Sequence, residues 1–344
     1  MPALTAIEAF TDELVAIRRD LHAHPEIGFE EVRTSGIVAE KLAAWGIEVH
    51  RGIGGTGVVG ILEGMGGPGR RIGLRADMDA LPMDEITNLP WRSTIPGRMH
   101  ACGHDGHTTM LLGGDEIYGI HNAPNLDPGQ IAVFPGAAMA GADFFDIKIT
   151  GKGSHGAMPH VGRDPVIVAI SLAAALQTIV SRNADPREAA VLSITQIHAG
   201  SAYNVIPEEA MLAGTVRTFS PEIAKLIRER MREICAGMAL TFGVQIDIDI
   251  RGIFDVLVNH PEQAVATAAV AAEIVGVGNV LTEPKPVMGS EDFADMLRVV
   301  PGAYAWVGHA GSVPVHNPAF VLDDGILPIG ASLLARLVET RSKA

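Results

Sequence analysis

Between residues 143 and 250 the chain alternates strand-like and helix-like patterns in an order that few folds can accommodate. Apolar residues at every second position predict strands, and apolar residues spaced three or four apart predict helices. The resulting order is strand, helix, strand, strand, helix, strand, over residues 143–150, 164–182, 189–198, 210–219, 221–242 and 244–250. This is the split βαβ order of a ferredoxin-like domain.

Helices and strands of a different kind stand on both sides of this block. Helices are predicted over residues 5–20, 35–45 and 327–340, and strands over residues 47–62, 71–79 and 116–122. We therefore predict an α/β protein with an interrupted domain. Residues 1–142 and 255–344 form one domain, and residues 143–254 form a smaller α+β domain inserted into it.

The composition is that of a globular protein with room for two cores. Of the 344 residues, 47% are hydrophobic and 19% are charged. A formal net charge of −14 argues against a nucleic-acid or anionic-membrane partner. The first residues lack the pattern of a signal peptide, and no apolar run is long enough to span a bilayer. Two cysteines make no disulfide framework, so we expect a cytoplasmic protein.

The stretch Met99-His-Ala-Cys-Gly-His-Asp-Gly-His107 concentrates three histidines, a cysteine and an aspartate in nine residues. In an extended segment Cys102 and His104 would point to the same side and could reach one metal ion. A thiolate with an imidazole suits zinc, cobalt, nickel or manganese better than calcium. The alternative is a buried structural cysteine beside surface histidines, but the density of the cluster favours the metal site.

Other polar residues stand where the predicted strands end. Asp77 and Asp79 close one strand, and His121 closes another. Ligands of open α/β sheets gather at the carboxyl ends of strands, so these side chains are candidates for the same site. His316 lies in a loop between two prolines, which restrict its backbone.

Seven motifs in this order resemble the M20 metallopeptidase superfamily. The resemblance is strongest to its amidohydrolase branch of hippurate hydrolases, N-acyl-amino-acid amidohydrolases and auxin-conjugate hydrolases. It covers nearly the whole chain. The motifs are Arg18–Glu26, Leu74–Pro82, Met99–His107, Gly151–His160, Asn204–Pro207, Gly214–Phe219 and Met288–Phe293.

The resemblance implies a zinc-exopeptidase-like catalytic domain that binds two divalent metal ions, either Zn, Mn, Ni or Co. It places four residues of this chain on the metals and gives Asp79 the role of orienting groups of the metal site. The four implied ligands are Cys102, His104, His121 and His316.

The resemblance also implies that the inserted domain is a lid that mediates formation of a homodimer or higher homo-oligomer. His155 matches a lid histidine that stabilises an oxyanion, often across the dimer, and Asn204 and Arg217 match residues that hold a substrate carboxylate. The implied activity is metal-dependent hydrolysis of the amide bond in an N-acyl amino acid or a related conjugate.

The chain departs from the family in one place. Relatives carry Gln-Pro-Ala-Glu-Glu-Gly before the strand that bears His121, with the first glutamate as general base and the second as metal ligand. Here Gly113-Gly114 leads directly into that strand at Asp115-Glu116. Either this sequence omits a segment that the molecule carries, or the chain truly lacks it. Loss of a core strand would leave backbone groups unpaired, which favours omission. A true loss would favour the alternative function, a catalytically inactive metal- or ligand-binding homologue.

Overall fold

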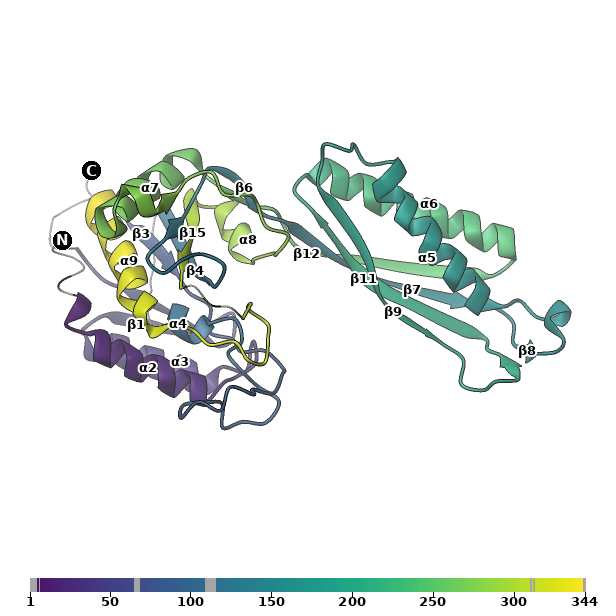
Figure 1. The fold of residues 1–344 in the computed structure, drawn as a ribbon, viewed down its shortest axis with the longest axis horizontal. Coiled ribbons are helices and arrows are strands. Elements are labelled where there is room, and N and C mark those ends of the chain that lie inside the picture. The colour runs from purple at the N-terminus through teal and green to yellow at the C-terminus, as the bar shows by residue number, and fades with distance from the viewer. Residues whose placement is uncertain are drawn as a thin grey trace. The chain divides into compact units, whose positions relative to one another are not determined.

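A computed structural model describes residue 5 and residues 7–64, 69–108, 116–309, 311 and 313–342. The chain divides into two compact units (Figure 1). The first unit comprises the residues up to Gly136, Asn259–Lys285, and the residues from Met296 onward. The second comprises Ala137–Val258 and Pro286–Asp295. The inserted domain predicted over residues 143–254 lies within the second unit.

The first unit is built on a five-stranded sheet in the order β14-β5-β15-β4-β3. Its strands are β3 (Ile72–Arg75), β4 (Glu116–Ala123), β5 (Ile131–Ala132), β14 (Val280–Leu281) and β15 (Gly302–Gly308). Neighbours β3, β4 and β15 run parallel, and β5 is antiparallel to β15. The central strands β4 and β15 are nearly continuous apolar runs, as expected for strands covered on both faces.

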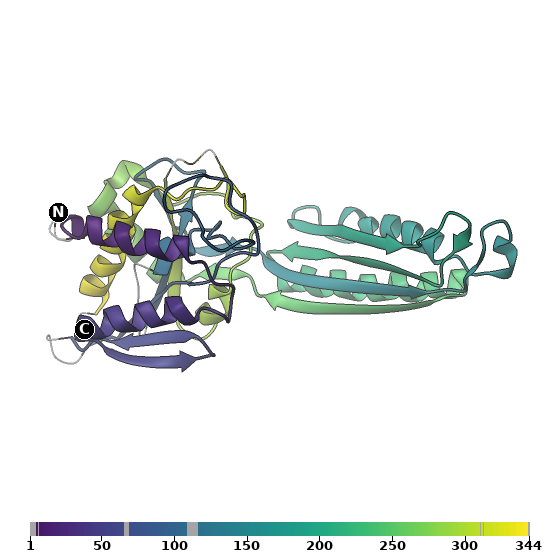
Figure 2. The same ribbon diagram turned by 90° about the horizontal axis from the view of Figure 1, so that it is seen from below.

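Helices cover this sheet, and a hairpin packs beside one of them (Figure 2). The helices are α2 (Thr11–Ala23), α3 (Val32–Ala44), the five-residue α4 (His104–Thr108), α7 (Pro261–Val275), α8 (Phe293–Leu297) and α9 (Leu327–Arg341). Phe293–Asp295 of α8 fall in the second unit. The hairpin of β1 (Glu48–Ile53) and β2 (Gly57–Ile61) contacts α3. Single 3-10 turns occur at η2 (Val277–Asn279) and η3 (Asp324–Ile326).

The second unit has the predicted ferredoxin-like topology. Its antiparallel sheet has the order β12-β7-β11-β9, and two helices pack on it (Figure 1). The strands are β7 (Gly141–Thr150), β9 (Ala190–Ala199), β11 (Glu209–Thr218) and β12 (Gln245–Phe254), and the helices are α5 (Pro165–Arg182) and α6 (Pro221–Phe242). The predicted mixed α/β class with an inserted α+β domain is confirmed.

Smaller elements complete the second unit and its chain connections. A short ribbon pairs β8 (Ser154–His155) with β10 (Val205–Ile206), next to the 3-10 turn η1 (Pro159–Val161). A second ribbon pairs β6 (Gly136–Met139) with β13 (Leu257–Asn259), where the chain passes between the two units.

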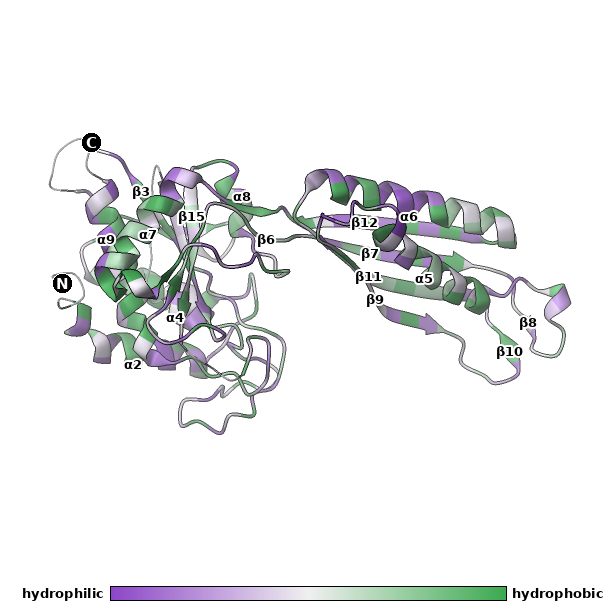
Figure 3. Ribbon diagram, turned by 45° about the horizontal axis from the view of Figure 1, so that its top comes forward, coloured by the Kyte–Doolittle hydropathy of each residue, from purple (hydrophilic) through white to green (hydrophobic). Residues whose placement is uncertain are grey.

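Local sequence signals account for the ends of the two long helices. The Asp164 carboxylate accepts a hydrogen bond from the backbone N–H of Val166, and the Ser220 hydroxyl accepts one from Ile223. A proline follows each cap, where its missing N–H costs nothing. Helix α6 ends at Gly243, whose φ of 65° is left-handed. Hydrophobic residues (green) and hydrophilic residues (purple) alternate along α6 in Figure 3, as expected for a helix with one face in the core.

Helix α5 differs from one prediction. Within the described residues it is long and apolar enough to cross a membrane by length and composition, which the sequence analysis did not anticipate. The core helix of a globular domain passes the same test. Four large side chains of α5 are buried in the core against the sheet: Val168, Leu172, Leu176 and Ile179.

Candidate metal centre

Three of the four ligands implied by the resemblance meet in the first unit. Donor atoms of Cys102, His104 and His121 all lie within 4.8 Å of one another. The Cys102 Sγ lies 3.3 Å from the His121 Nε2. The fourth residue, His316, hydrogen-bonds the Cys102 sulfur through its side chain. The structure therefore brings a thiolate ligand and three imidazoles to one place.

The backbone between Cys102 and His104 is not extended, so that prediction is wrong. Gly103 has a φ of 89°, which turns the chain into α4. A Cβ at this position would lie 2.4 Å from the Asn122 Nδ2. That amide nitrogen donates a hydrogen bond to the Cys102 carbonyl. Both ligands face the same site because the glycine permits this turn, not because they alternate along a strand.

The loop that carries His316 is tied to the same turn. His316 has a φ of 62°, a left-handed conformation that is uncommon for residues other than glycine. Its backbone N–H donates to the Ala101 carbonyl at 2.7 Å. Such backbone strain persists where surrounding contacts hold it, and it is concentrated at functional sites.

Hydrogen bonds to the Nδ1 atoms of two histidines orient their rings in the centre. The Nδ1 of His104 is 2.8 Å from the Asp79 Oδ1, and the Nδ1 of His121 is 2.7 Å from the Asn122 carbonyl. The Nε2 of His121 then faces the Cys102 sulfur, whereas the Nε2 of His104 also lies 3.3 Å from the Asp77 Oδ2. Metal-bound histidines are oriented in this way by a carboxylate or carbonyl partner.

The charges of the cluster suit a cation. Burial alone would raise the pKa of Cys102, but the facing His121 charge and hydrogen bonds from three histidines lower it to about 4. Burial would lower the pKa of His104, yet Asp77 and Asp79 raise it well above its usual value. A thiolate thus sits among protonated imidazoles, and a divalent ion would replace those protons.

The spacing of the donors also fits a metal. An ion bonded at about 2.3 Å to sulfur and about 2.0 Å to nitrogen in tetrahedral geometry separates the two atoms by about 3.5 Å. The Cys102 Sγ and His121 Nε2 are 3.3 Å apart. The residues present therefore fit a zinc-class ion in both donor type and spacing.

Asp77, His104 and His107 form a second group of candidate ligands. In this group the buried His107 has a structural role and is not a metal ligand. The Nδ1 of His107 lies 2.8 Å from the Asp77 Oδ1, and its Nε2 accepts the Asn122 backbone N–H at 3.0 Å. Both ring nitrogens are engaged, so His107 positions its neighbours. Sequence analysis did not identify Asn122, whose only sequence signal is its place after His121.

Behind His104 lies a buried ionic network that the sequence did not reveal. The Asp105 carboxylate contacts Arg18 at 3.4 Å and the His22 Nδ1 at 3.0 Å. The His22 Nε2 lies 3.3 Å from Glu85. Arg18 also forms an ion pair with Asp324. This network ties α2 to the first turn of α4 and so holds in place the turn that carries the ligand His104.

Glu116 does not take the place of the missing glutamates. It begins β4, five residues before His121, which corresponds to about 17 Å along a strand. Its carboxylate is buried, and Arg341 contacts it at 2.6 and 2.9 Å. Burial would raise the pKa of Glu116, but hydrogen bonds from Arg341, Tyr118 and Gln263 lower it to about 2. Glu116 is therefore a structural anion at the opposite end of the strand.

The remaining predicted site residues belong to the second unit. His155 in β8 is paired with Val205, and the Gly156 N–H donates to the Asn204 carbonyl at 2.8 Å. His155 and Asn204 are thus neighbours, and both are exposed.

Arg217 lies at the other end of the same sheet. It follows Glu209 by eight residues of β11, which is about 27 Å along the strand. Glu209 pairs with Thr150, the residue from which the chain leads to β8. The guanidinium of Arg217 lies 5.6 Å from the Phe144 ring centre, and burial lowers the pKa of Arg217. One chain therefore does not bring Arg217 together with His155 and Asn204.

Comparison with known proteins places these motifs in a family. Residues 73–134 match the model for peptidase family M20/M25/M40, and residues 138–240 match the model for the peptidase dimerisation domain. The hippurate hydrolase of Campylobacter jejuni is 37% identical over 94% of this chain and 95% of its own length. An N-acetylcysteine deacetylase of Bacillus subtilis is 35% identical over 96% of this chain and 97% of its own.

A solved structure shows the same architecture. A dinuclear metal-binding peptidase of family M20 from Bacillus subtilis superposes with a TM-score of 0.81 at 31% identity, covering 98% of this chain and 100% of the other. The alignments also leave positions of the relatives without a counterpart in this chain. That with the Campylobacter jejuni protein spans 366 positions, whereas 94% of this chain is about 323 residues. About 43 positions of the alignment therefore hold no residue of this chain.

Proposed function

Since the chain belongs to peptidase family M20, in its amidohydrolase branch, we propose that it hydrolyses the amide bond of N-acyl amino acids with the help of divalent metal ions. The observation that carries this proposal is the meeting of the Cys102 sulfur with a ring nitrogen of His104 and the Nε2 of His121, all within 4.8 Å of one another. Relatives named for hippurate and N-acetylcysteine suggest the substrate class, an acyl group on an amino acid with a free carboxylate.

In this proposal Cys102, His104, His121 and His316 hold two divalent ions of zinc, manganese, nickel or cobalt. Such ions lower the pKa of a bound water and polarise a carbonyl group. Asp79 fixes the tautomer of His104 through its hydrogen bond to Nδ1. His107 and Asn122 hold the turn at Gly103, which sets the direction of both Cys102 and His104.

The substrate carboxylate and the oxyanion require residues from two copies of the chain. The guanidinium group of Arg217 can bind a carboxylate through two parallel hydrogen bonds. His155 and Asn204 lie about 27 Å from it along the sheet, too far to contact the same small molecule. We therefore propose a homodimer in which Arg217 of one subunit acts together with His155 of the partner subunit and Asn204 of the partner subunit. The match to a dimerisation domain supports this arrangement.

The edge strand β9 and helix α5 are the surfaces that we assign to the dimer contact. β9 is the last strand of its sheet, so one row of its backbone groups is left for another strand. The side chains of Ile167 and Ile170 on α5 are more than half exposed, and so is that of Ile197 on β9. Since Cys102 and Cys235 are both free and buried, we place the protein in the cytoplasm.

Mixing two impaired variants tests the shared site. At a hippurate concentration well below KM, Arg217→Ala and His155→Ala should each strongly reduce the hydrolysis of hippurate, measured as release of benzoate. A mixed dimer of the two variants contains one site with both residues intact and one site with neither. Random mixing makes about half of the dimers mixed, so about a quarter of all sites should be restored. Activity that does not rise after exchange of subunits would show that both residues act on the substrate within one chain.

Arg217→Ala also tests the substrate class. Losing a hydrogen-bonded charge pair costs about 1.5–3 kcal/mol, or about 10- to 150-fold in KM for hippurate. The KM for the methyl ester of hippurate should change little, since the ester has no carboxylate. Equal changes for both substrates would contradict the role of Arg217.

One observation favours a second function, that of a metal- and ligand-binding protein without turnover. Between His107 and His121 the sequence has no acidic residues other than Asp115 and Glu116, and Glu116 is engaged with Arg341. Such a protein would bind metal and hippurate with an affinity sensitive to Cys102→Ser but would release no benzoate at any metal concentration. The matched control is Cys235→Ser, which changes the other buried cysteine.

A further inference from the structure

Two parallel strands of the first unit end in a buried amide and a buried imidazole that touch each other. Gly308 of β15 pairs with Ala123 of β4, so the two strands end side by side. Asn122 lies near the end of β4, and His309 directly follows β15. Both side chains are buried, and the His309 Nε2 lies 3.3 Å from the Asn122 Oδ1. This contact therefore stands at the carboxyl edge of the sheet, next to the ligand His121.

The contacts of the Asn122 amide determine which way it points. One end of the amide faces the carbonyl oxygen of Cys102, which can only accept a hydrogen bond. The atom at that end must be the nitrogen, because an oxygen there would face another acceptor. The Asn122 Oδ1 then points to His309. Since an amide oxygen is also an acceptor, the His309 ring has to supply the proton from its Nε2.

The surroundings of His309 hold its ring in place for this donation. Its backbone N–H donates to the Ala123 carbonyl at 3.4 Å. The Phe320 ring packs edge-on against the imidazole, with the ring centres 5.9 Å apart. A Cβ at Gly311 would lie 3.0 Å from the His309 Cε1, so a side chain there would press against the ring. Burial lowers the pKa of His309, so the ring is neutral at pH 7, and its single N–H is the one that faces Asn122.

Asn122 carries this constraint to the turn that presents two metal ligands. Its Nδ2 donates to the carbonyl of Cys102, the residue before Gly103 and its left-handed turn. Its backbone N–H donates to the His107 Nε2 at 3.0 Å. Asn122 therefore holds the chain on both sides of His104. Rotation of the amide would remove the donor from the Cys102 carbonyl and release one of these two attachments.

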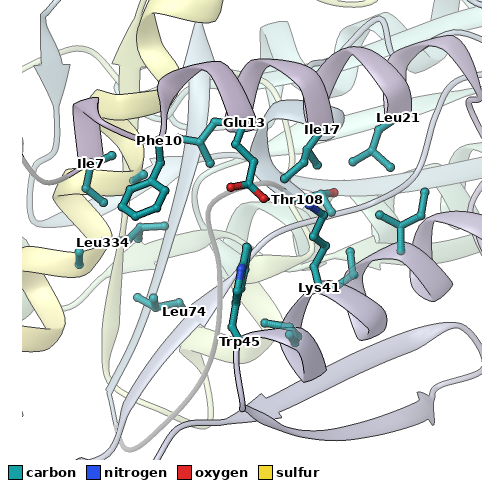
Figure 4. Close-up of a pocket in the computed structure, with 16 residues that line it drawn as sticks. Ile7, Phe10, Glu13, Ile17, Leu21, Lys41, Trp45, Leu74, Thr108 and Leu334 are labelled. Carbon is teal, nitrogen blue, oxygen red and sulfur yellow. Dashed lines mark hydrogen bonds and ion pairs between the residues drawn. The ribbon is translucent and has the colours of Figure 1, made fainter.

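The first unit also contains a cavity, but His309 does not contribute to it. This cavity has a volume of about 480 Å³ and lies between α2, α3, β3 and α9 (Figure 4). Neither Asn122 nor His309 is among the described residues that line it. A molecule bound there would not explain a buried histidine at the end of β15. The role of His309 has to be sought in its contact with the Asn122 amide.

We propose that His309 is a positioning residue of the metal centre. By donating from its Nε2 to the Asn122 Oδ1, it keeps the Asn122 Nδ2 on the Cys102 carbonyl. It thereby holds the turn at Gly103, from which Cys102 and His104 face the metal. The proposal rests on the metal site of the proposed function but not on hydrolysis. Partners one step beyond the ligands commonly change metal affinity by about 10- to 100-fold.

Two variants of His309 separate hydrogen bonding from packing. His309→Gln keeps an N–H donor near the position of the Nε2, whereas His309→Leu fills similar space and cannot donate. His309→Leu should bind zinc at least about tenfold more weakly than the wild type and give an altered thiolate-to-cobalt absorption band, and His309→Gln should restore both. Zinc affinity is measured by competition with a chromophoric chelator, in the absence of substrate.

His260→Leu is the matched control for a general loss of stability. His260 is a half-buried histidine of the same unit, and its Nδ1 accepts the backbone N–H of Gly302 at 3.2 Å. Gly302 begins β15, so this contact stands at the opposite end of that strand from His309. His260→Leu therefore also removes a ring hydrogen bond but should keep the zinc affinity and the cobalt band of the wild type.

A double-mutant cycle with Asn122→Ala tests whether His309 acts through the amide. In the Asn122→Ala background, His309→Leu should weaken zinc binding by less than about twofold, because residues that act through one contact are not additive. Equal weakening in both backgrounds would overturn the proposal. So would a wild-type zinc affinity of His309→Leu, or an affinity of His309→Gln as low as that of His309→Leu.

Hydrogen exchange of the metal-free protein separates this proposal from the proposed function. The backbone N–H groups of Gly106 and His107 both donate to the Gly103 carbonyl, so their exchange reports on the turn. They should exchange faster in His309→Leu than in the wild type, His309→Gln or His260→Leu. Equal exchange in all four proteins would overturn the positioning role even if hippurate is hydrolysed. A wild type that binds no zinc would instead contradict the proposed function, and the exchange rates would still decide whether His309 holds the turn.

Discussion

The buried His22 makes the stability of this protein depend on pH in a way that can be calculated. Burial would lower the pKa of His22, but the Asp105 charge and hydrogen bonds with Asp105 and Glu85 raise it from 6.5 to about 9. The imidazolium is therefore the form that the folded state prefers. In the unfolded chain the same ring loses its proton near pH 6.5.

The size and sign of the effect follow from these two values. Each pKa unit corresponds to 1.36 kcal/mol, so a rise from 6.5 to about 9 contributes about 3 kcal/mol to the free energy of unfolding. This contribution is complete below pH 6.5, where both states carry the proton. It declines as the pH rises above 6.5 and is lost above about pH 9.

Urea unfolding of the metal-free protein at several values between pH 6 and pH 10 measures this effect. The wild type should lose about 3 kcal/mol more across this range than His22→Gln, because all other titrating groups are common to both. His24→Gln is the matched control, since His24 lies two residues away at an exposed position. Parallel pH profiles for the wild type and His22→Gln would refute the assignment of the proton to His22.

Two further predictions concern the turn that carries the metal ligands. In the metal-free protein, alkylation of Cys102 by iodoacetamide should proceed at a nearly constant rate from pH 9 to pH 5 and fall near pH 4, whereas Cys235, whose pKa burial raises to about 11, should stay unreactive. A rate for Cys102 that rises steeply toward pH 9 would contradict the thiolate. Gly103→Ala should destabilise the protein by about 1–3 kcal/mol and weaken zinc binding, because the residue has a φ of 89° and a Cβ would meet Asn122. A melting temperature and zinc affinity equal to those of the wild type would show that the turn tolerates a side chain.

The second unit could be predicted from sequence almost completely. Strands β7 and β12 alternate over most of their length, both helices carry side-chain caps and α6 ends at a glycine, so local signals and tertiary structure agree. The predicted helix over residues 221–242 has the bounds that the structure shows. The pairing order β12-β7-β11-β9 then follows from the split βαβ pattern.

The metal cluster could be predicted only in part. The residue types of Cys102, His104 and His121 indicated a metal site. The turn at Gly103 that brings Cys102 and His104 together could not be predicted from their spacing in the sequence. The turn depends on Asn122, which reaches Cys102 from another strand. The support from His22 to Asp105 joins residues 83 positions apart, and no local pattern signals such a contact.

The resemblance matched His155 to a lid histidine that often acts across the dimer, and it matched Arg217 to a residue that holds the substrate carboxylate. The length of β11 separates them, since an extended strand advances about 3.3 Å per residue. This separation gives a physical reason for a second copy, which the sequence analysis expected from the resemblance alone. The strand predicted over residues 71–79 is shorter in the structure, because β3 ends at Arg75. Beyond its end, the Asp77 carboxylate hydrogen-bonds the His107 ring.

The most direct test of the central claim is a titration of the metal-free protein with cobalt(II), recording the thiolate-to-cobalt absorption band and the rate of benzoate release from hippurate in the same samples. The account predicts that the two signals rise together to saturation, and that Cys102→Ser abolishes both while Cys235→Ser retains both. A band that saturates while no benzoate appears would contradict the claim of hydrolysis and leave a protein that binds metal without turnover.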